Sequence, residues 1–167
     1  NPIVSLADAS LGGISWRDAA AYVPVQVAGC VSGAVLANLM FDLSAVSVAQ
    51  TGRASGAHAL AEVVASAGLV LVIFSLIRTG RSHTAPAAVG AYIAAAYWFT
   101  SSTSFANPAI TVGRGFSDTF AGIAPASMPS FIGAQLVGGL IAVVLIAVLY
   151  PRPTPEQGGG PAVPAQS

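Results

Sequence analysis

The sequence predicts an all-α membrane protein, and three observations support this fold class. Of the 167 residues, 54% are hydrophobic and 7% are charged, whereas soluble domains carry about 25% charged residues. Long apolar stretches recur along the chain, and about 20 such residues suffice to cross a bilayer. Two further segments begin with Asn-Pro and are too short to cross, so they must be packed inside protein at membrane depth.

The apolar stretches define the expected helices within one domain, residues 1–150. We expect four full spanning helices, at residues 19–41, 57–77, 86–100 and 129–150. Residues 1–10 and 108–117 are predicted to be half-helices, because Asn is a good N-cap and Pro is tolerated in a first helical turn. Residues 151–167, rich in Pro, Gly and Gln, are predicted to form a disordered tail.

The arginines predict the orientation of these helices. Loops that face the cytoplasm collect Lys and Arg. Placing the 78–83 loop inside gives four arginines inside and two outside; the inside set is Arg17, Arg78, Arg81 and Arg152, and the outside set is Arg53 and Arg114. The tail is then cytoplasmic.

Composition and motifs exclude several functions. Six Arg and six acidic residues give zero net charge, which argues against a nucleic-acid partner. The single cysteine, Cys30, has no partner for an internal disulfide. We find no nucleophile–base arrangement, phosphate loop or metal spacing, so we expect no enzyme activity, no cofactor and no bound metal.

The two halves of the chain form an internal repeat. Asn1-Pro2 is echoed by Asn107-Pro108, and each pair is followed by a spanning helix with a similar pattern of Pro and small residues. These patterns are Pro24-x4-Gly29-x3-Gly33 and Pro129-x4-Ala134-x3-Gly138. The first half-helix starts from the inside face and the second from the outside face. Such inverted repeats place their conduction or binding site where the broken helices meet, near the bilayer midplane.

With these motifs in place, the sequence resembles the aquaporin and aquaglyceroporin family. Asn107-Pro108-Ala109 matches the family's Asn-Pro-Ala, and Asn1-Pro2-Ile3 is a slight variant of it; segment 62–73, Gln26 and Gly29 also fit family helices. The resemblance implies six spanning helices, so we expect a chain truncated before residue 1, lacking the first two. It also implies a homotetramer in a bacterial-type plasma membrane, with Asn1 and Asn107 donating hydrogen bonds to solutes in the pore.

The resemblance further implies a selectivity filter, of which three residues can be located. Counting from the second Asn-Pro-Ala, they are Ala95, Ser104 and Ile110. Most aquaporins carry arginine at the position of Ile110 and water-selective members carry histidine at that of Ala95, so this filter departs from the family pattern. Pore width and lining donors set selectivity. We therefore predict a passive channel for water and small uncharged solutes, glycerol-like molecules or metalloid acids such as arsenite. Arg114, one turn later, is not assumed to replace the missing arginine.

Glu62 is an ionisable residue inside a spanning segment, which is a functional hypothesis by default. A proton relay is one interpretation. The family resemblance favours another, in which the buried carboxylate accepts hydrogen bonds from the loop beside a half-helix. Two alternatives to a channel stay open at this point: a secondary transporter, which also uses inverted repeats, and a channel fragment that is non-functional alone.

Overall fold

The computed structural model describes residues 1–151, and this part of the chain is helical throughout its regular structure. The α-helices are α1 (Pro2–Ser10), α2 (Trp16–Met40), α3 (Gly56–Arg78), α4 (Ala85–Phe99), α5 (Pro108–Gly113) and α6 (Met128–Leu149). Short 3-10 turns are η1 (Ser82–Thr84), η2 (Arg114–Phe116) and η3 (Pro125–Ser127). The expected disordered tail lies, apart from Pro151, outside the described residues.

Three of the described helices are long and apolar enough to cross a membrane: Trp16–Met40, Gly56–Arg78 and Pro125–Leu149, the last including η3. The fourth expected span, α4, has 15 residues, about 22 Å at 1.5 Å per residue. This is shorter than the roughly 20 residues that a span needs, although η1 directly precedes it. A fourth crossing by α4 stays a prediction.

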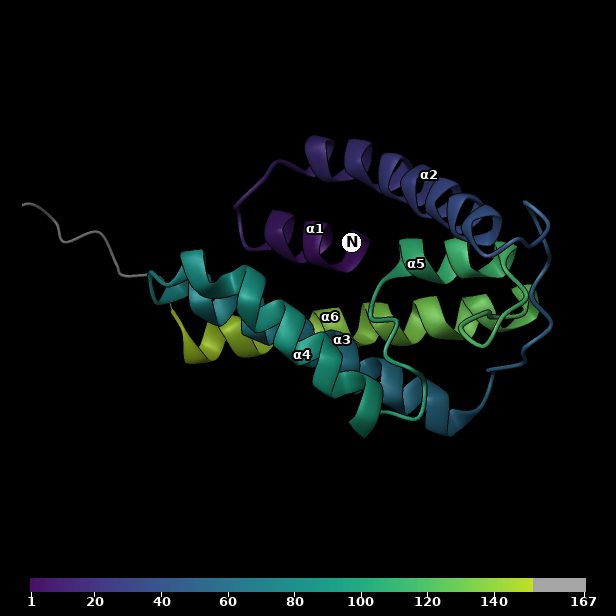
Figure 1. The fold of residues 1–167 in the computed structure, drawn as a ribbon. Helices are drawn as coiled ribbons and strands as arrows, with labels where there is room; N and C mark the ends of the chain where they lie inside the picture. Colours follow the sequence, from purple (N-terminus) through teal and green to yellow (C-terminus); the bar gives the residue numbers. More distant parts are fainter. Residues whose placement is uncertain (152–167) are drawn as a thin grey trace, which may run out of the picture.

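The two short helices lie inside the bundle, and their starts face each other. In Figure 1, α1 and α5 run in opposite directions from neighbouring N-terminal ends, with α2 along one side and α3, α4 and α6 on the other. The carboxamide of Asn1 donates to the backbone oxygen of Ala106 across 2.8 Å, which joins the two starts directly. This is the arrangement of two half-helices that the internal repeat predicts.

Glycines allow close contacts between the helices. This is expected in a membrane, where helices associate through van der Waals packing rather than through the hydrophobic effect. A Cβ at Gly138 of α6 would collide with the backbone oxygen of Val63 in α3, and one at Gly113 of α5 would lie 2.7 Å from the backbone oxygen of Cys30 in α2. By contrast, no described atom lies within 4 Å of a Cβ added at Gly29 or Gly33. The close approach suggested by this Gly-x3-Gly pair is therefore not made within the described chain.

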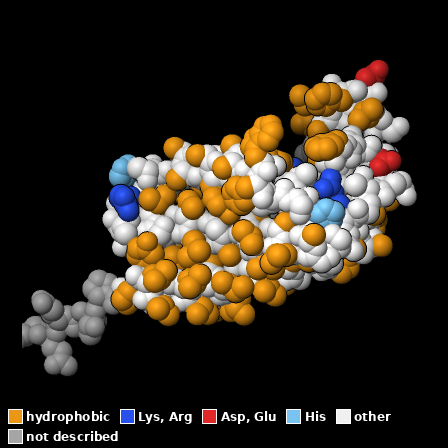
Figure 2. Space-filling model, turned by 90° about the horizontal axis from the view of Figure 1, so that it is seen from below, with side chains coloured by type: hydrophobic (Ala, Val, Ile, Leu, Met, Phe, Trp, Pro, Cys, Tyr) orange, Lys and Arg blue, Asp and Glu red, His pale blue; other side chains and the backbone are white. Residues whose placement is uncertain are grey.

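The outer surface is apolar between two ends that carry the charges. In Figure 2 hydrophobic side chains cover the middle of the face, and the Lys/Arg, Asp/Glu and His side chains gather towards its ends. Large side chains such as Leu140 and Val148 of α6 are 65% and 70% exposed. Large exposed apolar patches on a soluble protein would mark an interaction surface. Here they suit contact with lipid, as in an integral membrane protein.

The connections separate into two sets. In Figure 1 the α1–α2 and α3–α4 connections and the end of α6 lie together, and the α2–α3 and α5–α6 connections lie at the opposite end. Arg78 and Tyr150 line one cavity, of about 360 Å³, at the first end. Arg53 donates to the backbone oxygen of Gly122 at the second end, across 2.8 Å. Within residues 1–151, the structure thus places Arg17, Arg78 and Arg81 at one end and Arg53 and Arg114 at the other (Figure 1).

Candidate functional site

Each half-helix begins with an asparagine that caps its own first turn. Asn1 Oδ1 accepts from the backbone N–H of Ile3 at 3.1 Å, and Asn107 Oδ1 accepts from those of Ala109 at 2.9 Å and Ile110 at 3.3 Å. This capping satisfies backbone donors that have no helical partner, and it directs each carboxamide nitrogen away from its helix. The nitrogen of Asn107 donates to no residue among 1–151, so it is available to a ligand.

Both asparagines line one cavity of about 220 Å³. Its walls come from Asn1 at the start of the chain, α3, α4, the loop before α5, α5 and η2. The lining residues are Asn1, Leu69, Val89, Ile93, Tyr97, Ser104, Phe105, Asn107, Ile110 and Arg114. Most of this wall is apolar, and its polar groups are few and convergent, which is typical of a site for small molecules.

The structure brings two of the three expected filter residues to this cavity. Ser104 and Ile110 line it, and the Ser104 hydroxyl is buried without a hydrogen-bond partner in the described chain. Ala95 does not line it and is exposed. On α4 the cavity wall is formed by Val89, Ile93 and Tyr97, which are spaced four residues apart and therefore lie on one face. Ala95, midway between Ile93 and Tyr97, lies on the opposite face of α4.

The loop that leads into α5 has an unusual backbone. Thr103, Ser104 and Ala106 have φ values of 64°, 48° and 45°. This left-handed region costs a residue with a Cβ about 1–2 kcal/mol, so the surrounding structure must hold the loop in place. Such strain is typical of positions whose geometry serves a site.

Glu62 supplies much of that restraint. Its side chain is fully buried, and Oε1 accepts from the Ser102 hydroxyl at 2.6 Å and the Phe105 N–H at 2.9 Å. Oε2 accepts from the Ala106 N–H at 2.9 Å and from Gln135 Nε2 at 2.6 Å. A carboxylate has about four lone-pair sites, and all are engaged. This is the contact pattern of the scaffold interpretation, and it leaves no lone pair for a relayed proton.

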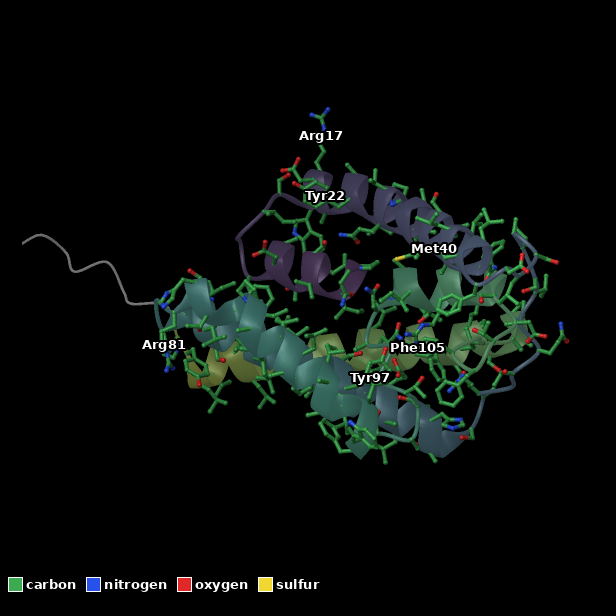
Figure 3. The ribbon with its side chains drawn as sticks, in the orientation of Figure 1. Arg17, Tyr22, Met40, Arg81, Tyr97 and Phe105 are labelled. Atoms are coloured by element: carbon green, nitrogen blue, oxygen red, sulfur yellow. The ribbon has the colours of Figure 1, made fainter. Side chains whose placement is uncertain are left out.

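Arg114 belongs to the cavity wall, although residue spacing did not select it. Its Cζ lies 4.3 Å from the centre of the Phe105 ring, and its Nη2 donates to the Tyr97 hydroxyl at 3.0 Å. Figure 3 shows Phe105 and Tyr97 close together beside α5. The available signal was the spacing of seven residues from Asn107, which returns to the same helix face.

A second arginine approaches the same ring from the loop between α2 and α3. The Cζ of Arg53 lies 5.4 Å from the Phe105 ring centre. Its guanidinium donates to three backbone oxygens, those of Gly122, Phe120 and Ser102. Burial lowers the pKa of Arg53 below its ordinary value, and the charge of Arg114 lowers that pKa further. Arg53 thus ties together the loops around the cavity.

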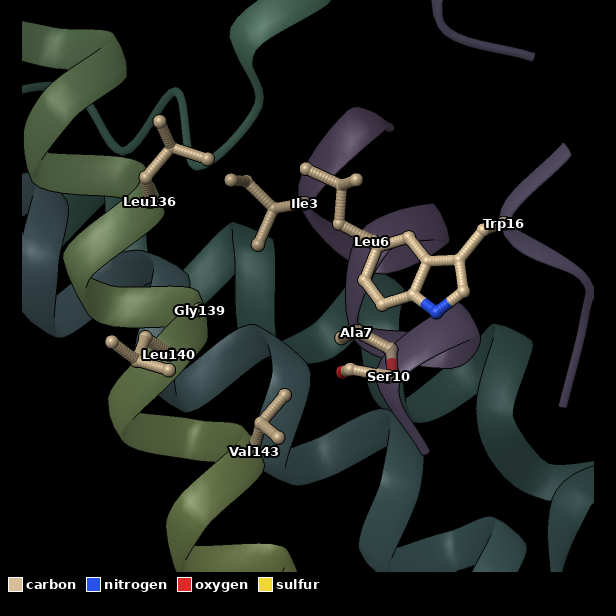
Figure 4. A pocket seen from close by; sticks show the side chains of 9 residues that line it. All are labelled: Ile3, Leu6, Ala7, Ser10, Trp16, Leu136, Gly139, Leu140 and Val143. Carbon is tan, nitrogen blue, oxygen red and sulfur yellow. The ribbon is translucent and has the colours of Figure 1, made fainter. Parts of the chain in front are cut away.

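A larger hollow, of about 320 Å³, lies between α1 and α6 (Figure 4). Its side chains are aliphatic or aromatic apart from the hydroxyl of Ser10. The labelled lining residues are Ile3, Leu6, Ala7, Ser10, Trp16, Leu136, Gly139, Leu140 and Val143. Without convergent donors or acceptors it cannot replace the hydration of a polar solute, so the cavity at the two asparagines is the candidate site. Within residues 1–151, no group of three or more His, Cys, Asp or Glu is placed to hold a metal ion.

Comparison with known proteins gives an independent assignment. The family model described as Major intrinsic protein matches residues 1–105. The aquaglyceroporin AqpS of Rhizobium meliloti (strain 1021) is 49% identical over 146 residues, which cover 87% of this chain and 62% of that relative. The chain therefore spans less than two thirds of the relative's length. No solved structure matches. The family model covers more than half of the chain, and so this chain belongs to the major intrinsic protein family.

Proposed function

We propose that the protein is a passive transmembrane channel for water and small uncharged solutes. The observation that carries this proposal is the single cavity shared by Asn1 and Asn107, at the facing starts of α1 and α5. Helix starts carry positive partial charge, which disfavours cations between them. The amide nitrogen of Asn107 offers hydrogen bonds to a passing oxygen atom.

The lining favours solutes that combine hydroxyl groups with an apolar side. Leu69, Val89 and Ile93 form an apolar wall, and the asparagines and Ser104 supply polar groups. Ile110 places no charge directly after the motif. A relative bears the name aquaglyceroporin, which supports glycerol-sized polyols as one substrate class. Undissociated metalloid acids such as arsenite share the neutral charge and the hydroxyl groups, and are included in the proposal.

The secondary transporter fits the site less well than the channel does. Coupled transport needs an ion site near mid-membrane, and Glu62 is the acidic residue placed deep in a spanning helix. Its carboxylate already accepts four hydrogen bonds from other residues of the protein, so it is not free to bind a coupling ion. The proposed assembly has α4 as a further spanning helix, four subunits, and the end with Arg78 and Arg81 in the cytoplasm of a bacterial-type plasma membrane.

Stopped-flow light scattering of vesicles that contain the whole protein tests this function. An osmotic step with an impermeant sugar reports water flux, and a glycerol or urea step reports solute entry through reswelling. We expect both fluxes to exceed those of empty vesicles, and the solute flux to rise linearly with concentration and to ignore ion gradients. Fluxes equal to those of empty vesicles would refute the channel. A saturating flux that follows an ion gradient would favour the transporter.

A further inference from the structure

The helical segment made of the N-cap Asn107, α5 and the following turn η2 carries three residues that line the cavity. Asn107, Ile110 and Arg114 are three and four residues apart, the spacing that brings side chains to one side of a helix, and all three border the cavity. Ile110 stands where most aquaporins carry arginine. Arg114 thus brings a guanidinium to the same cavity one turn farther from the asparagine.

Arg114 is held by side chains from two other segments. The Phe105 ring, in the loop before α5, lies 4.3 Å below its Cζ. The Tyr97 hydroxyl, on α4, accepts from its Nη2 at 3.0 Å. Because all three residues line the cavity, this hydrogen bond joins η2 to α4 at the cavity wall.

The guanidinium has few other restraints. Its Nη1 is buried and has no hydrogen-bond partner in the described chain. Phe105, in contrast, is firmly placed: it is 3% exposed, its N–H donates to Glu62, and its ring packs edge-on against Phe131 at 5.2 Å. The position of Arg114 therefore depends on a fixed ring beneath it and on one hydroxyl beside it.

From this geometry we infer that Tyr97, Phe105 and Arg114 form the size-selecting constriction of the channel. This inference rests on the proposed function and replaces Ala95 as the contribution of α4. The Tyr97–Arg114 hydrogen bond closes part of the opening, so the constriction is narrower than the small residues Ala95 and Ser104 suggest. Solutes that pass must fit beside the guanidinium, which donates to their oxygen atoms.

The first test compares the ratio of glycerol to water permeability in vesicles. Tyr97→Phe keeps the ring and removes the hydroxyl, so Arg114 loses its hydrogen bond and can move aside. We expect this ratio to rise about 2- to 10-fold, the range that loss of one net hydrogen bond supports. Arg114→Met, which removes the donors and much of the bulk at the head of the side chain, should raise it at least as much.

The matched control is Ala95→Val, which adds bulk at the exposed α4 position selected by residue counting. It should leave the ratio unchanged. Wild-type ratios in both Tyr97→Phe and Arg114→Met, or a reduced ratio in Ala95→Val, would overturn the inference. Wild-type protein that conducts no faster than empty vesicles would instead refute the proposed function, so the two failures are distinguishable.

A second measurement compares the flux of the same protein before and after thiol modification, so that its result does not depend on how well different variants fold. Cys30 is the single cysteine of the chain, so Cys30→Ala gives a background for Arg114→Cys and, as control, Ala95→Cys. A small methanethiosulfonate reagent should abolish most of the water flux at position 114 and none at position 95. Complete modification at position 114 with unchanged flux would overturn the inference.

Discussion

At the scale of single residues, Glu62 shows how one buried carboxylate holds a loop in place. It joins α3 to the loop before α5 and to Gln135 of α6 through four hydrogen bonds. The two backbone bonds hold Phe105 and Ala106, and Ala106 has a left-handed φ of 45°. Glu62 does not line the cavity itself, but it thus positions Phe105, which does.

Glu62→Gln should destabilise the protein and reduce flux. The new amide group presents N–H donors to groups that are themselves donors, and each buried donor left unsatisfied costs about 1–3 kcal/mol. We expect a lower unfolding midpoint in detergent and a loss of solute flux in vesicles.

Ser102→Ala is the control for this substitution, because it removes one of the four hydrogen bonds and leaves the carboxylate in place. Its unfolding midpoint should fall between those of the wild type and Glu62→Gln. A Glu62→Gln protein with wild-type midpoint and flux would contradict the scaffold role.

Residue-level prediction from sequence succeeds where the signal is local. Asn1 and Asn107 are recognisable because an asparagine that caps a Pro-initiated helix depends on the next three residues only. The assignment of Ala95 to the filter stays a prediction: Ala95 is not among the residues that line the cavity, and counting back from Asn107 takes no account of the intervening loop, which contains three left-handed residues. Arg114 depends on Tyr97 and Phe105, contacts that spacing alone does not reveal.

At the scale of helices, α6 shows how small residues set the packing. Gly138 faces α3, and Gly139 faces α1, where a Cβ would lie 2.7 Å from Ile3 Cγ2. Ile3 itself is 2% exposed and packs with Val70, Phe74 and Ile146. The half-helix α1 is thus seated on α3 and α6 through its third residue.

Gly138→Ala should destabilise the bundle, because its Cβ meets the backbone of α3, which cannot move aside as a flexible side chain would. Overpacking of this kind typically costs about 1–3 kcal/mol. Thermal unfolding in detergent should show a clearly lower midpoint.

Gly133→Ala in the same helix is the matched comparison, since a Cβ added there would meet no described atom within 4 Å. Alanine favours a helix over glycine by about 1 kcal/mol, so this midpoint should be equal to or above wild type. Equal midpoints for the two variants would contradict the proposed α3–α6 contact.

Helix positions follow from the sequence more closely than helix ends do. The apolar stretch beginning at residue 19 predicts a span, yet α2 starts at Trp16 because the Ser15 hydroxyl caps it, accepting from the Asp18 N–H at 3.1 Å. The predicted half-helix 108–117 is α-helical only to Gly113 and then tightens into the 3-10 turn η2. Capping and tightening are settled by single side chains and local contacts, which hydropathy does not detect.

At the scale of the whole molecule, the arginines among residues 1–151 divide between the two ends of the bundle. A thiol reagent that does not cross membranes can locate these ends in intact cells, using cysteines placed in the Cys30→Ala background. We expect Ala54→Cys, beside Arg53, to be labelled from outside and Arg81→Cys to be protected until the cells are opened, because arginine-rich loops stay in the cytoplasm. Both residues are exposed in the structure. The reverse labelling would invert the proposed orientation.

The placement of α2 has a mechanical consequence. This helix packs mainly against α1, α5 and η2, and Gln26 donates to Ser5 of α1 at 3.0 Å while the backbone of Cys30 touches Gly113 of α5. Both half-helices, α1 and α5, therefore pack against the same helix, α2. A tilt of α2, for example from a change in bilayer thickness, would shift the two asparagines together and preserve their mutual register.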